Sequence, residues 1–114
     1  MQTVIEMPEF IRCAKKLGLS DDERDNIIDM IATTPEKGDE ISGTGGVRKV
    51  RIAGRGKGKS GGYRVITFFS GSDIPVFLLY MYGKGQKANI TDTEKHTFKI
   101  ATSAIVDRYR RKKK

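Results

Sequence analysis

The sequence predicts an α+β fold in which helices pack on an antiparallel sheet. Apolar residues recur at helical spacing near both ends of the chain. The middle instead carries short β-branched and aromatic runs separated by glycine-containing turns. A chain of 114 residues that is 37% hydrophobic can bury one core. We therefore expect a single domain over residues 1–114, with a basic C-terminal tail from about residue 110.

The N-terminal third predicts a short strand followed by a helical hairpin. Thr3–Glu6 is suited to a strand, and Pro8 is tolerated in the first turn of the helix that follows. Gly18 ends this helix, and Ser20–Glu23 has the spacing of a capping box for the next. An apolar stripe then continues until the chain meets Pro35. Two antiparallel helices with a short connection are the expected result.

The middle of the chain predicts three strands. Val47–Ile52 alternates, which places Lys49 and Arg51 on one face and the apolar residues on the other. Tyr63–Phe69 is rich in β-branched and aromatic residues. Val76–Tyr82 is apolar throughout, as expected of a central strand covered on both faces.

A final helix is predicted behind a second capping box, Thr91–Glu94. Its apolar residues recur at helical spacing: Phe98, Ala101, Ile105 and Tyr109.

The net charge of +8 is segregated along the chain. Residues 1–40 carry five Lys/Arg and ten Asp/Glu, whereas residues 41–72 carry seven Lys/Arg and no acid. Residues 73–114 carry ten Lys/Arg and four acids. Proteins that bind polyanions concentrate one sign of charge in this way, so nucleic acid or another phosphate-rich partner is expected.

The remaining composition points to the cytoplasm. Cys13 is the only cysteine, which excludes an intramolecular disulfide framework and favours a reducing compartment. No apolar run is long enough for a transmembrane helix, and the N-terminus lacks the pattern of a secretory signal. We expect no association with a membrane.

The glycine-rich segment Ala53–Gly62 matches two nucleotide-binding patterns only superficially. Gly58-Lys59-Ser60 ends a relaxed phosphate-loop pattern, and the glycines also fit a dinucleotide fingerprint. Both motifs need a helix directly afterwards, but a strand is predicted here. Two interpretations remain: a backbone that lies close to a ligand while cationic side chains fan out, or a flexible hairpin loop with solvated charges.

Five segments resemble the RelE/HigB toxins of bacterial type II toxin–antitoxin systems. They are Gly43–Arg51, Gly56–Val65, Tyr82–Lys84 and, for the HigB-like branch, Ile5–Phe10 and Gly38–Gly43. The resemblance implies the compact RelE/ParE-type fold. It also implies an mRNA endonuclease that cleaves messages in the ribosomal decoding site until a cognate antitoxin neutralises it.

Candidate catalytic residues follow from the chemistry of RNA cleavage. The 2′-hydroxyl can attack the adjacent phosphorus, so the reaction requires neither a metal nor another cofactor. Arg64 is the first candidate to stabilise the phosphorane, because guanidinium pairs bidentately with phosphate oxygens. Lys57, Lys59 and Lys84 are candidates for general base or acid. Tyr82 would either stack on a base or pack in the core.

A second set of cations is expected to contact the RNA backbone: Arg48, Lys49, Arg51, Arg55 and Lys87. The tail Arg110–Lys114 would either touch ribosomal RNA or serve as a disordered solubilising segment. The expected partners are the antitoxin, mRNA and the ribosome. Two other functions suit the same features: a ParE-like inhibitor of DNA gyrase, and a non-enzymatic RNA-binding module.

Overall fold

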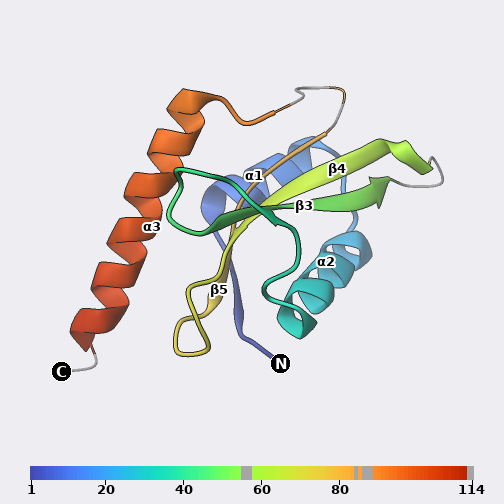
Figure 1. Cartoon of the computed structure of the whole chain (residues 1–114). Helices are drawn as coiled ribbons and strands as arrows, with labels where there is room; N and C mark the ends of the chain where they lie inside the picture. Colours follow the sequence, from blue (N-terminus) through green and yellow to red (C-terminus); the bar gives the residue numbers. More distant parts are fainter. Residues whose placement is uncertain (55–57, 84, 86–88, 113–114) are drawn as a thin grey trace.

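A five-stranded sheet forms the centre of the molecule, with strand order β1-β5-β4-β3-β2 (Figure 1). The structure is a computed structural model and describes residues 1–54, 58–83, 85 and 89–112. The elements in chain order are β1 (Val4–Glu6), α1 (Pro8–Lys16), α2 (Asp21–Thr33), β2 (Asp39–Glu40), β3 (Val47–Gly54), β4 (Gly58–Phe68), β5 (Val76–Gly83) and α3 (Asp92–Lys112). The α+β prediction is confirmed.

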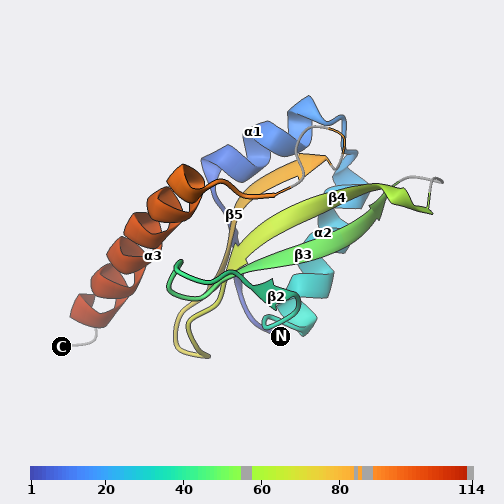
Figure 2. The same ribbon diagram turned by 45° about the horizontal axis from the view of Figure 1, so that its top comes forward.

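Helices cover both faces of the sheet. α1 and α2 lie together on one side of it, whereas α3 lies apart from them (Figures 1 and 2). The first face buries Phe10 of α1 and Ile27 of α2 against Val50 and Val65 of the sheet. The second face buries another apolar cluster, on which α3 packs through residues such as Phe98. We call these the α1/α2 face and the α3 face.

Both predicted capping boxes are present. The backbone N–H of Glu23 donates to Ser20 Oγ over 3.1 Å, and the N–H of Ser20 donates to Glu23 Oε1 over 2.8 Å. Thr91 and Glu94 make the same reciprocal pair at the start of α3. Each box satisfies backbone donors that have no partner within the helix, so it fixes where that helix begins.

The sheet is mixed rather than wholly antiparallel. β5 lies between β4 and β1, as a strand buried on both faces should, but β1 runs parallel to it. Among the described residues, two helices and three strands lie between β1 and β5 in the sequence. This connection is long enough for the chain to return and enter β5 in the same direction as β1. β2 is an additional two-residue strand that was not predicted, because two residues are too few to show an alternating pattern.

Two boundaries differ from the prediction. β4 begins at Gly58, five residues before the predicted start at Tyr63, because its glycine-rich beginning lacks the side chains that mark a strand. α3 continues to Lys112, so the first part of the basic tail is helical. Arg and Lys favour helices, and Arg111 there donates to Asp107 over 2.7 Å.

A β-bulge at Leu79 changes which side chains of β5 share a face. Ile66 pairs with Tyr80, and the next residue of β4, Thr67, pairs with Leu78. Leu79 is therefore the extra residue, and it lies on the α3 face together with Tyr82. In a regular strand Tyr82 would share a face with Leu78, which instead packs on the α1/α2 face.

Gly38 holds β2 close to β3. Its φ is +99°, and a Cβ built there would lie 2.5 Å from the carbonyl oxygen of Lys49. Both the backbone conformation and the close approach require glycine.

We expect Gly38→Ala to lower the free energy of unfolding by about 1–3 kcal/mol, because it combines a strained φ with a clash against backbone. Chemical denaturation of the purified protein measures the change. Gly85→Ala is the control, since a Cβ there meets nothing within 4 Å. Equal stability of the two variants would contradict this account of Gly38.

Candidate functional site

Three side chains form a row across the centre of the sheet. Arg51 of β3 lies opposite Arg64 of β4, and Arg64 lies opposite Tyr82 of β5. Residues directly opposite one another in antiparallel strands project to the same face. Since Tyr82 belongs to the cluster beneath α3, the row lies on the α3 face.

The α3 face is divided into an apolar part and a cationic part. The apolar part lies under α3 and includes Val47, Ile66 and Phe68. Further along β3 and β4 the same face carries Lys49 and Arg51, as the alternation predicted, and Arg64.

The cationic part forms a concavity of about 550 Å³, which we call the cationic groove. The described residues that line it are Lys37, Gly38, Asp39, Lys49, Val50, Arg51, Arg64 and Asn89. Four of these are cations and one is an acid. A polar concavity with this excess of positive charge is suited to a phosphate-bearing ligand.

Arg64 is half-buried in the groove and is held by its strand. Its Nη1 donates to the carbonyl oxygen of Tyr63 over 3.2 Å. Among the described residues, no carboxylate lies within ion-pair distance of Arg64, Arg51 or Lys49. These cations therefore retain donors for an anionic ligand.

Tyr82 lies next to Arg64 but is only 1% exposed. Its ring centroid is 5.9 Å from that of Tyr80, which in turn is 6.2 Å from that of Phe98 on α3. A base can stack only on an exposed ring face, so the stacking role is not compatible with this arrangement. The burial matches the alternative, core packing.

Arg48 lies on the other face of β3. Its Nη1 donates to the carbonyl oxygen of Gly38 over 3.4 Å, and its Nη2 is 3.9 Å from Glu40 Oε1. Side chains alternate along a strand, so neighbouring basic residues cannot all line one groove. The structure therefore separates Arg48 from Lys49 and Arg51.

Several predicted site residues cannot be placed relative to the groove. Lys59 is part of β4, but its side chain is not described. The others lie outside the described residues: Arg55, Lys57, Lys84 and Lys87.

Sequence reasoning missed three polar side chains among the described residues that line the groove, those of Lys37, Asp39 and Asn89. Lys37 and Asp39 are brought there by β2, whose pairing places Asp39 opposite Lys49. Asn89 lies just before α3, where the chain returns to the α3 face. The nearest signal in the sequence was Gly38. Its positive φ is a conformation that favours glycine, and it lies where the chain approaches the sheet at the start of β2.

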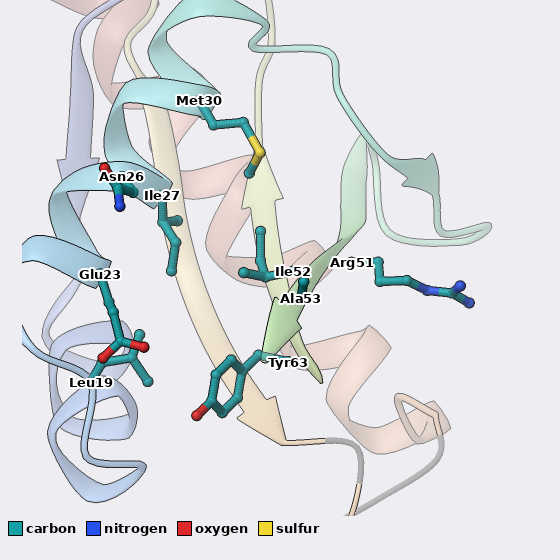
Figure 3. A pocket seen from close by; sticks show the side chains of 9 residues that line it. All are labelled: Leu19, Glu23, Asn26, Ile27, Met30, Arg51, Ile52, Ala53 and Tyr63. Atoms are coloured by element: carbon teal, nitrogen blue, oxygen red, sulfur yellow. The ribbon is translucent and has the colours of Figure 1, made fainter. Parts of the chain in front are cut away.

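A smaller concavity of about 240 Å³ lies on the α1/α2 face, between α2 and the β3–β4 pair (Figure 3). Ile27 and Met30 of α2 face Ile52 and Tyr63 across it, and Arg51 points away from it (Figure 3). Arg51 is the only cation among its described lining residues. This apolar concavity is therefore distinct in chemistry from the cationic groove.

A model of the RelE toxin of RelE/RelB toxin–antitoxin systems matches residues 2–113. The chain belongs to the RelE family. It is thus a RelE-family toxin of a toxin–antitoxin system, a family whose toxins are paired with RelB antitoxins. No helix in the described part of this RelE-family chain has the length and apolar character needed to cross a membrane.

Lys49→Gln or Arg51→Gln is expected to weaken the binding of single-stranded RNA and to reduce its dependence on salt. For each phosphate that the protein no longer neutralises, the slope of log K against log salt concentration should fall in magnitude by about 0.7. Anisotropy titrations of a labelled oligonucleotide at several salt concentrations measure both effects.

Arg48→Gln is the matched control, because it removes the same charge from the opposite face. Its salt slope should equal that of the unmodified protein. If Arg48→Gln reduced the slope as much as Arg51→Gln, the α3 face would not be the surface that binds RNA.

Proposed function

We propose that this RelE-family toxin is an mRNA endonuclease of the HigB-like branch that cleaves messages in the ribosomal decoding site. A cognate antitoxin holds it inactive by covering the cationic groove. The observation that carries the proposal is Arg64, which lies half-buried on a central strand among the cations of a polar groove. RNA binding alone would require positive charge but not a guanidinium held rigidly at the centre of a sheet.

The reaction is an intramolecular transesterification. The 2′-oxygen forms a bond to phosphorus, the bond from phosphorus to the 5′-oxygen breaks, and the products end in a 2′,3′-cyclic phosphate and a 5′-hydroxyl. One proton leaves the 2′-hydroxyl and one is delivered to the 5′-oxygen. The protein must orient the sugar-phosphate and stabilise the negative charge that develops on the phosphorane oxygens.

Arg64 is assigned to the phosphorane. Its planar fork of donors matches two phosphate oxygens, and its position on β4 limits the motion that would weaken such contacts. Arg51 and Lys49, on the adjacent strand and the same face, bind the flanking phosphates. Tyr82, buried beside Arg64, supports the strand on which Arg64 lies rather than touching RNA.

Proton transfer is assigned to the lysines of the glycine-rich segment and of the β5–α3 connection. Lys57, Lys59 and Lys84 remain the candidates, because an ammonium crowded by other cations loses its proton more easily. The absence of acids between residues 41 and 72 supports this assignment for Lys57 and Lys59.

Arg64→Ala should abolish growth arrest when the toxin is induced without its antitoxin. Loss of a donor that stabilises developing negative charge typically lowers the rate by about 10²–10³-fold. Primer extension on several transcripts should show new 5′ ends with the unmodified toxin and none with Arg64→Ala.

Arg12→Ala is the control and should remain toxic, since Arg12 lies on α1 and forms an exposed ion pair with Glu9. Cuts that persist unchanged in Arg64→Ala would remove Arg64 from the reaction. Growth arrest without any cuts, accompanied by DNA damage, would instead support the inhibition of gyrase.

A further inference from the structure

Another concavity, on the α3 face, adjoins the cationic groove and shares three of its lining residues. It measures about 380 Å³ and is also lined by Asp39, Lys49 and Asn89. Its other described lining residues are Glu40, Ile41, Ile90 and Lys95. We call it the side pocket, and a ligand bound at Arg64 can continue into it without leaving the surface.

The side pocket differs from the groove in its chemistry. Ile41 and Ile90 give it apolar walls, whereas Asp39 and Asn89 supply exposed polar groups. Asp39 lies opposite Lys49 in the β2–β3 ladder, so its side chain projects to the α3 face. The volume is within the range of about 300–1,000 Å³ that is typical of pockets for small organic groups.

The carboxylate of Asp39 determines which part of an RNA strand this pocket accepts. Among the described residues, two cations and two carboxylates line the side pocket, whereas four cations and one carboxylate line the groove, so the backbone remains in the groove while a base enters the pocket. Glu40 also lines the pocket, but its carboxylate lies toward Arg48, with Oε1 3.9 Å from Arg48 Nη2, so Asp39 is the carboxylate on the α3 face. Single-stranded RNA is commonly recognised through such unstacked bases.

We propose that the side pocket holds a nucleobase next to the scissile phosphate and that Asp39 selects bases that carry an exocyclic amine. An ionised carboxylate only accepts hydrogen bonds. Adenine, cytosine and guanine each offer an amine on the Watson–Crick edge, whereas uracil offers carbonyl oxygens on both sides of its single N–H. Uracil therefore binds more weakly, because its two carbonyl oxygens would face the carboxylate. This proposal rests on the proposed function, because it assumes that RNA lies in the cationic groove.

Binding of 2′-O-methyl oligonucleotides tests the proposal without requiring cleavage. The methyl group blocks the attacking oxygen, and hexamers of cytidine and uridine differ only in the amine or carbonyl at position 4 and the N3 proton. The full-length protein should bind the cytidine hexamer about tenfold more tightly than the uridine hexamer. Asp39→Asn, whose amide both donates and accepts, should reduce this ratio to near one.

Asp29→Asn provides the matched control, because it removes the same charge from an exposed position on α2. It should retain the tenfold ratio. Equal affinity of the unmodified protein for the two hexamers, or an unchanged ratio in Asp39→Asn, would overturn the proposal. Thermal denaturation of each variant shows that the fold is retained.

Mapping of cleaved 5′ ends in cells separates this proposal from the proposed function. Uracil should be under-represented at one position beside the cut for the unmodified toxin and restored there for Asp39→Asn. Cleavage without any bias against uracil would overturn the side-pocket proposal alone. Absence of cleavage, with the cytidine preference intact in the binding assay, would overturn the endonuclease and leave the pocket.

Discussion

The site depends on two arginines placed directly opposite one another at the centre of a sheet. Arg51 and Arg64 pair across β3 and β4, where like charges typically destabilise a sheet by about 0.2–1 kcal/mol. The neighbouring row offsets this cost, because Val50, Val65 and Met81 are fully buried on the α1/α2 face. Each such side chain contributes about 1.5–3 kcal/mol on burial, so the apolar row outweighs the cationic one.

The same ladder explains why the groove lies beside α3 rather than beneath it. The bulge at Leu79 shifts β5 by one residue, which brings Leu79 and Tyr82 to the α3 face together. They extend the apolar surface beneath α3 as far as the cationic row. The cations begin where this surface ends, so the helix does not cover Arg64 and the arginine remains accessible from the groove.

The sequence predicted most elements because their signals were local. Capping boxes mark the start of α2 and α3, and the alternation along β3 correctly assigned Lys49 and Arg51 to one face. The course of β2, the bulge at Leu79 and the parallel pairing of β1 depend on contacts between distant segments. No pattern within a short window carries that information.

The sequence predicted that the candidate site is cationic but not which residues line it. Arg64 was selected because a guanidinium pairs bidentately with phosphate oxygens, and no described carboxylate pairs with it in the fold. Asp39 and Asn89 were missed because they reach the groove only through strand pairing and the return of the chain to α3. Arg48 was included on its charge alone, although the alternation along β3 places it on the face opposite Lys49 and Arg51.

The fold converts a separation of charge along the sequence into a separation between faces. The acids of α2, among them Asp22, Asp25 and Asp29, are carried on the side of the sheet opposite the groove. Between groups that are exposed to solvent, charge interactions decay over about 8–10 Å at physiological salt, so the acids do little to neutralise the groove directly. They do repel a polyanion that approaches from their own side, and RNA therefore meets the α3 face first. Asp39 is the one carboxylate among the described residues that line the groove. Because it lies beside the cations and also lines the side pocket, the phosphates of a bound strand stay with the cations while a base contacts Asp39.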